Sequence, residues 1–222
     1  MRPLFLCLKM KKYFYLLFTI LLSCTKNFKL QEGDLLFQDL DSSPLCDAIE
    51  LVTPGYNGAN FSHIGLAVFD NDTLKVLEAI PPKVKLTNLD NFLNRSFDID
   101  GKPKVIVGRL KDKYLHSVEE AVSYSKSKLN IKYDEVFLIN NNSYYCSELI
   151  YEAFLNDSIF EIKPMTFLHP ISNDTLQIWK DYYKEIELEI PQNKMGINPG
   201  IMSLSNKIKM VHFYGIPDGL NN

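Results

Sequence analysis

The chain has 222 residues, enough for one domain with a substantial core. Apolar residues make up 46% of the chain and charged residues 23%, which excludes a disordered, collagen-like or disulfide-scaffold protein. The net charge of −3 provides no cationic excess for a phosphate backbone, so nucleic acid is not an expected partner.

The first 23 residues have the pattern of a secretory signal. Four cations and no acid are followed by a short apolar run at 13–22, which is too short to span a bilayer as a helix. A leucine three positions before Cys24 and a serine directly before it resemble a bacterial lipobox. We therefore expect residues 1–23 to be a lipoprotein signal peptide, and residues 24–31 to be the lipidated cysteine and its tether. The alternatives are a buried apolar segment with an incidental cysteine, and a start at Met10.

The mature chain is expected to be acidic and poor in cysteine. Loss of the signal removes four cations and no acid, so the net charge changes from −3 to −7. An acidic body does not adhere to anionic lipid by itself, so we expect membrane anchoring through Cys24, at the periplasmic or outer face of the cell envelope. Of the four cysteines, only Cys46 and Cys146 remain in the folded part. Two cysteines make no disulfide framework and no metal site, and no cofactor is implied.

Residues 32–222 are predicted to form one domain of short strands and helices. Alternating or short apolar runs indicate strands at 33–37, 61–69, 74–80, 84–86, 105–107, 186–190 and 209–214. Helical spacing indicates helices within 38–60, at 88–94, at 117–129 and from Cys146 onward. We expect Thr87 to cap the helix at 88–94, and Ser143 or a neighbouring Asn to cap the helix of Cys146. The pattern predicts an α+β fold with a mostly antiparallel sheet.

Cys146 is the first candidate for chemistry. It lies in the first turn of a predicted helix, where free N–H groups and the helix dipole stabilise a thiolate and lower the pKa of a cysteine. A nucleophilic cysteine is made in this way. The alternative is a structural thiol, because free cysteine is among the most buried residue types.

His63 and Glu78 are candidates on neighbouring strands. Gly65 and Ala67 share the strand face of His63, and these small residues are expected to leave room for another element, such as a helix end. A hairpin that turns at 70–72 would bring His63 and Glu78 to similar height. Glu78 could then hold the imidazole in the required tautomer. The alternatives are a structural histidine and an exposed edge-strand carboxylate.

Five short motifs occur in a fixed order along the chain. They are Gly33-Asp34-Leu35-Leu36-Phe37, Phe61-Ser62-His63-Ile64-Gly65, Val76-Leu77-Glu78-Ala79, Tyr144-Tyr145-Cys146-Ser147-Glu148-Leu149 and Gly196-Ile197-Asn198-Pro199-Gly200. Together they resemble the YiiX/YebB-like family of circularly permuted papain-like cysteine amidases and peptidases, which is related to the NlpC-type cell-wall endopeptidases. The chain keeps the order of that family, in which the histidine comes first, then the acid, then the cysteine.

The resemblance implies a circularly permuted papain-like fold, with the helix of the cysteine packed on an antiparallel sheet. It also implies amidase chemistry, in which Cys146 is the nucleophile, His63 the general base and then acid, and Glu78 the orienting group. The oxyanion of the tetrahedral intermediate needs hydrogen-bond donors. The backbone N–H of Cys146 is one, and Tyr145 is the candidate side chain, with Tyr144 as the alternative.

Three functions are compatible with these features. The leading hypothesis is a cell-envelope cysteine hydrolase that cleaves an amide through an acyl-thioester, in a peptidoglycan peptide or a related amide. The second is a thiol hydrolase or acyltransferase acting on an acyl lipid, for which an apolar groove would be expected. The third is a non-catalytic envelope-binding lipoprotein of the same fold.

Two further features receive structural interpretations. Cys46 is expected to be a partly buried structural thiol, and the alternative is a disulfide with Cys146 that would block the enzyme. Trp179, Tyr182 and Tyr183 are expected to pack into the core rather than form an aromatic subsite.

Overall fold

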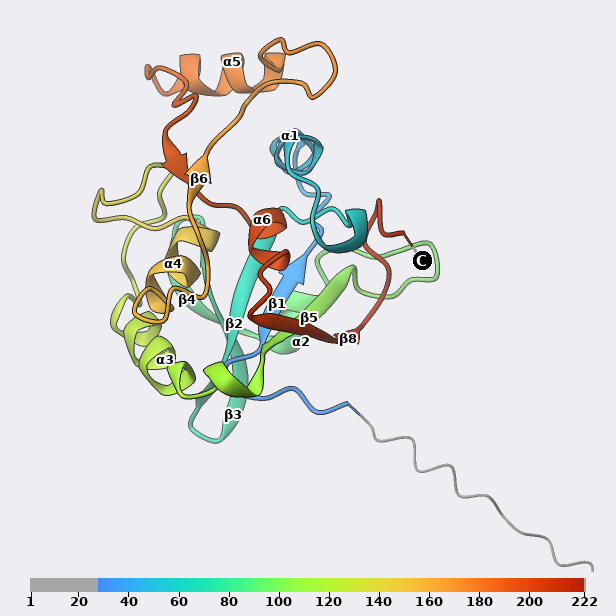
Figure 1. Ribbon diagram of the computed structural model, residues 1–222, viewed down its shortest axis with the longest axis vertical. Helices are drawn as coiled ribbons and strands as arrows, with labels where there is room; N and C mark the ends of the chain where they lie inside the picture. Colours follow the sequence, from blue (N-terminus) through green and yellow to red (C-terminus); the bar gives the residue numbers. More distant parts are fainter. Residues whose placement is uncertain (1–27, 222) are drawn as a thin grey trace, which may run out of the picture.

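A six-stranded antiparallel sheet is the centre of the computed structural model, which describes residues 28–221 (Figure 1). Its strand order is β4-β3-β2-β1-β5-β8. The strands are β1 (Leu35–Gln38), β2 (His63–Asp70), β3 (Thr73–Ile80), β4 (Lys83–Asn88), β5 (Val105–Leu110) and β8 (Ile208–Phe213). The predicted antiparallel α+β architecture is therefore confirmed. The predicted signal peptide and Cys24 lie outside the described residues.

The hairpin between β2 and β3 turns where the sequence predicts it. Asp70 pairs with Thr73, and the two residues between them, Asn71 and Asp72, have φ angles of 46° and 62°. Two consecutive positive φ angles match the twist of the flanking strands, and Asn and Asp tolerate this backbone region. The resulting register brings the start of β2 beside the end of β3.

Helices cover both faces of this sheet. They are α1 (Pro44–Val52), α2 (Leu89–Leu93), α3 (Ser117–Ser127), α4 (Cys146–Ala153), α5 (Gln177–Glu185) and α6 (Pro199–Ser203), with 3₁₀ turns η1 (Tyr56–Gly58) and η2 (Asp112–Tyr114). α3 and α4 pack on the face of Leu35, Ile64 and Leu77. α2 packs on the opposite face, against Leu36 and Val76. None of these helices is long and apolar enough to cross a membrane within residues 28–221.

Residues 163–196 form a separate part of the molecule, here called the α5 layer. It contains α5 and the short strands β6 (Lys163–Pro164) and β7 (Met195–Gly196), and it lies beside α1 and apart from the main sheet (Figure 1). Phe167, Trp179 and Tyr183 of this layer are buried together with Ala48 of α1. Trp179 and Tyr183 are core residues as predicted, whereas Tyr182 is only half-buried. Trp179 and Tyr182 also line a cavity, so the prediction holds only in part.

One predicted strand is wrong. Residues 186–190 do not extend, because Ile186 is the residue at which α5 ends and Glu187 has a φ angle of 57°. Ile186 and Ile190 instead pack against the aromatic cluster of the α5 layer. An apolar residue at every second or fourth position fits a helix end as well as a strand, so the local pattern was ambiguous.

Both predicted helix caps are also wrong. Asn88 takes the N-cap position of α2, and Thr87 belongs to β4, where its hydroxyl has a different partner. Tyr145, rather than Ser143 or an Asn, is the N-cap of α4. Tyr144 is held extended by backbone pairing to residues 132–134, so the helix begins only after this pairing ends.

Candidate active site

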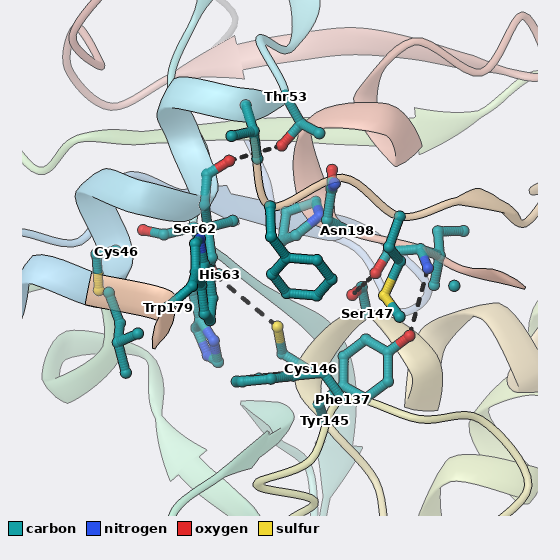
Figure 2. Close-up of a pocket in the computed structure, with 18 of the residues that line it drawn as sticks. Cys46, Thr53, Ser62, His63, Phe137, Tyr145, Cys146, Ser147, Trp179 and Asn198 are labelled. Atoms are coloured by element: carbon teal, nitrogen blue, oxygen red, sulfur yellow. Dashed lines mark hydrogen bonds between the residues drawn. The ribbon is translucent and has the colours of Figure 1, made fainter. Parts of the chain in front are cut away.

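Cys146 is the first residue of α4. Its side chain lies beside the start of β2. Tyr145 before Cys146 is extended, and its N–H donates to the carboxylate of Glu148 in the first turn, at 3.4 Å. Sγ of Cys146 lies 4.0 Å from the carbonyl oxygen of Ser62, the residue directly before His63 (Figure 2). The thiol is nearly buried and lies at the positive end of the helix dipole.

His63 and Glu78 form a short buried contact. Nε2 of His63 lies 2.6 Å from Oε2 of Glu78, and their side chains are 6% and 0% exposed. Because Nε2 is engaged in this way, Nδ1 is the ring nitrogen left for Cys146. The structure thus brings together the three residues that the sequence analysis selected, from β2, β3 and α4.

The small residues on the strand face of His63 do not make the room for a helix end that was predicted. A Cβ atom on Gly65 would lie 2.3 Å from Cγ1 of Val76 and 3.2 Å from Cε2 of Phe92. The room beside Gly65 is therefore filled from β3 and α2, not by a helix end. α4 lies on the opposite face of the sheet, and His63 reaches Cys146 because it is the first residue of its strand.

Arg95 and Thr87 complete the surroundings of Glu78, and the sequence analysis missed both roles. Nη1 and Nη2 of Arg95 donate to the two carboxylate oxygens at 2.7 and 2.5 Å. The hydroxyl of Thr87, on the neighbouring strand β4, donates to Oε1 at 2.5 Å. An arginine two residues after α2 carries no motif, so only the folded arrangement identifies it.

These contacts set the charges of the pair. Burial disfavours the ionised form of Glu78, but the hydrogen bonds from Arg95 and His63 hold its pKa well below its usual range. Burial likewise disfavours the imidazolium of His63, but the contacts with Cys146 and Glu78 raise its pKa to about 9. The arrangement therefore favours a charged imidazolium between the carboxylate of Glu78 and the sulfur of Cys146.

A cavity of about 850 Å³ opens beside Cys146 and His63. α1, the loop after Tyr133 and the α5 layer supply most of its wall. The lining is mainly apolar and includes Leu45, Ile49, Phe137, Met165, Trp179 and Ile201. Figure 2 shows Phe137 and Trp179 near the thiol and the imidazole. The apolar groove that the sequence did not reveal is therefore present.

Cys46 is a second thiol on the cavity wall. Its Sγ lies 3.5 Å from Oγ of Ser42 and 3.6 Å from Oγ of Ser43. Cys46 and Cys146 are both free thiols. This arrangement agrees with the structural interpretation of Cys46.

The two tyrosines considered as oxyanion donors have other contacts. The hydroxyl of Tyr145 accepts a hydrogen bond from the N–H of Ile197 at 3.3 Å, and it points away from the sulfur of Cys146 (Figure 2). The hydroxyl of Tyr144 lies 3.1 Å from that of Tyr124. The role predicted for Tyr145 stays a prediction.

Comparison with known proteins relates this arrangement to a family. Residues 29–212 match the model of the "Permuted papain-like amidase enzyme, YaeF/YiiX, C92 family". A curated relative, the uncharacterized protein YiiX of Escherichia coli (strain K12), is 29% identical over 127 residues, which are 57% of this chain and 58% of the relative. The matched region thus spans less than two thirds of that relative.

A solved structure has the same fold. The crystal structure of metalloprotein yiiX from Escherichia coli O157:H7 superimposes with a TM-score of 0.70 at 24% identity, covering 86% of this chain and 100% of that one. The predicted permuted papain-like fold is confirmed by these matches.

The described residues, 28–221, do not support a metal site. Among residues 28–221, the group of acids, cysteines and histidines close enough to bind an ion is Asp39, Asp41 and Asp218. Nζ of Lys104 lies 3.2, 2.6 and 3.1 Å from their carboxylates, respectively. The ammonium group already supplies the positive charge at this position, so the group is a cluster of ion pairs.

Arg95→Leu is expected to lower the free energy of unfolding by about 3 kcal/mol, because a buried carboxylate loses its charged partner. Arg95→Lys keeps the charge but not the two-pronged contact, so its loss should be smaller. Urea unfolding at neutral pH measures both. A leucine variant as stable as the wild type would show that Glu78 does not depend on Arg95.

The ratio of alkylation rates at Cys146 by iodoacetate and iodoacetamide is expected to fall as the pH rises through about 9. The raised pKa keeps His63 cationic below that pH, and the cation attracts the anionic reagent but not the neutral one. Peptide mapping by mass spectrometry separates Cys146 from Cys46. His63→Asn is the control and should remove the step. A wild-type ratio that does not change across the pH range would contradict a cationic His63 beside Cys146.

Proposed function

The chain belongs to the permuted papain-like amidase family, and from this premise we propose that it is a cysteine amidase. In the proposal Cys146 is the nucleophile, His63 the general base and acid, and Glu78 the residue that orients the imidazole. The observation that carries the proposal is the buried 2.6 Å contact of His63 with Glu78, at the imidazole that adjoins Cys146.

The proposed reaction follows from this geometry. The thiolate of Cys146 attacks the amide carbonyl, a C–S bond forms, and an electron pair moves to the carbonyl oxygen. As the first residue of α4, Cys146 has a backbone N–H without a partner in the helix, which can donate to that oxygen. When the C–N bond breaks, His63 gives its proton to the leaving amine.

Hydrolysis of the thioester completes the cycle. Neutral His63 takes a proton from water, and the hydroxide formed attacks the acyl carbon. The C–S bond then breaks, the carboxylic acid leaves and the ion pair of Cys146 with His63 is restored. Throughout, the carboxylate of Glu78 stabilises the imidazolium and fixes its orientation.

The cavity indicates which acyl group the enzyme would take. Its wall near Cys146 is formed by aliphatic and aromatic residues such as Leu45, Ile49 and Phe137, and burial of apolar surface there contributes about 25 cal/mol per Å². We propose an amide whose acyl part is apolar. A peptidoglycan peptide, rich in charged groups, has fewer partners on such a wall.

The test compares substrates that differ in the acyl part. Decanoyl p-nitroanilide should be cleaved with a higher kcat/KM than acetyl p-nitroanilide, and both should be cleaved faster than a peptidoglycan tripeptide amide. Cys146→Ala and His63→Ala should abolish turnover, and Glu78→Gln should lower kcat by about 10²-fold or more.

Ile49→Trp tests the role of the cavity. The larger side chain takes up room in the cavity at α1, so the variant should reduce cleavage of the decanoyl amide and spare the acetyl amide. Faster cleavage of the peptide amide would favour peptidoglycan. Inactivity toward every amide, together with an inert Cys146, would support the non-catalytic lipoprotein.

We also propose that the enzyme acts in the cell envelope, held by lipid on Cys24. The support is the lipobox-like sequence, and the cysteine lies outside the described residues. When the full chain is expressed in a bacterium with labelled palmitate, the wild type should carry label in the membrane fraction. Cys24→Ser should carry none and leave that fraction. Equal labelling of the two chains would exclude Cys24 as the lipid site.

A further inference from the structure

Tyr133 lies beside the segment that leads into the cysteine helix. The N–H of Tyr144 donates to the carbonyl of Lys132 at 3.2 Å, and the N–H of Asp134 donates to the carbonyl of Tyr144 at 3.0 Å. These two bonds form a parallel bridge between Tyr133 and Tyr144, two residues before Cys146. The position of Tyr133 relative to α4 is therefore fixed by backbone contacts.

The other side of Tyr133 is fixed by the main sheet. Its N–H donates to the carbonyl of Pro82 at 3.0 Å, just after β3, the strand of Glu78. Tyr133 therefore lies between the strand of the acid and the helix of the thiol. Its side chain lines the same cavity as Cys146 and His63.

The hydroxyl of Tyr133 is free to bind a ligand. Within residues 28–221 it has no hydrogen-bond partner, whereas the hydroxyls of Tyr144 and Tyr145 both have one. A phenol hydroxyl that lines a cavity and has no protein partner can donate a hydrogen bond to a bound ligand. The acceptor that the reaction creates in this cavity is the oxyanion on the attacked carbonyl.

We propose that Tyr133 is a further catalytic residue, whose hydroxyl donates a hydrogen bond to the oxyanion formed when Cys146 attacks. The inference rests on the proposed function and replaces Tyr145 as the side-chain donor. When the C–S bond forms, the carbonyl electron pair moves to oxygen, and two donors meet it: the N–H of Cys146 and the O–H of Tyr133. No proton leaves Tyr133, and the interaction ends when the carbonyl re-forms.

The electrostatics agree with a donor role. Burial, and then the negative charge of Cys146, hold the pKa of Tyr133 well above its usual value. The phenol of Tyr133 therefore keeps its proton. A hydroxyl that keeps its proton in a desolvated site can stabilise a developing negative charge on a neighbouring atom.

Asn198 and Trp179 also carry hydrogen-bond donors, line the same cavity and are weaker candidates. Oδ1 of Asn198 accepts from the N–H of Ile201 at 2.9 Å, so this carboxamide is fixed as the N-cap of α6. Nε1 of Trp179 is also buried without a hydrogen-bond partner within the described residues, but this indole belongs to α5 and packs edge-to-face against Phe167 at 5.0 Å. Neither residue lies on a segment paired with the one that leads into Cys146.

The experiment separates oxyanion stabilisation from thiol reactivity in the whole chain. Tyr133→Phe should lower kcat/KM for decanoyl p-nitroanilide by about 10²-fold, the effect of losing one oxyanion donor. It should leave the rate of Cys146 alkylation by iodoacetamide unchanged, because displacement of iodide creates no oxyanion. Binding of decanal, which forms a hemithioacetal and protects Cys146 from alkylation, should weaken in parallel.

Tyr145→Phe, Asn198→Leu and Tyr151→Phe are measured alongside. Tyr151 lies on α4 outside the cavity, so its variant is the matched control and should match the wild type. Unchanged turnover in Tyr133→Phe, or a loss confined to the Tyr145 or Asn198 variant, overturns the proposal while the cysteine amidase stands. A wild-type chain that neither cleaves the anilide nor binds decanal overturns the proposed function, and this inference with it.

Discussion

The buried carboxylate of Glu78 is the group on which the candidate site depends. An ion without solvent exposure is stable only when donors replace its hydration, and here Arg95, Thr87 and His63 do so from three different elements. Because these elements converge on one carboxylate, its charge ties β2, β3, β4 and the segment after α2 together. The same charge fixes the direction of the imidazole, and with it the ring edge that is left for Cys146.

The thiol reaches this imidazole through a different kind of constraint. α4 packs on the face of the sheet opposite to α2, so the thiol has to reach the imidazole at the end of the strand. The bridge of Tyr144 to Tyr133 ends the extended chain at Tyr145 and sets where the helix begins. The N-terminal end of α4, the start of β2 and the apolar cavity beside the α5 layer therefore adjoin one another.

Much of the fold was predictable from local patterns. The hairpin of β2 and β3 followed from alternation and from Asn71 and Asp72, and the helix of Cys146 followed from its apolar spacing. The wrong predictions were those in which a local signal competed with a distant partner. Thr87 has the chemistry of a cap, but its hydroxyl is used by a carboxylate on the next strand. The segment after α5 alternates like a strand, but Glu187 has a positive φ angle, and Ile186 and Ile190 pack against the aromatic cluster of the α5 layer.

The sequence by itself determined the candidate residues and their order, because a cysteine at a helix start and a histidine and an acid on adjacent strands leave periodic signals. Only the tertiary structure decided which further residues surround these three and form the cavity beside them. Arg95 lies 17 residues from Glu78 in the chain, and the cavity wall combines α1 with a layer more than a hundred residues later. Such contacts depend on how separate elements pack, and no local periodicity encodes them, because each side chain meets its partner only after the sheet has formed.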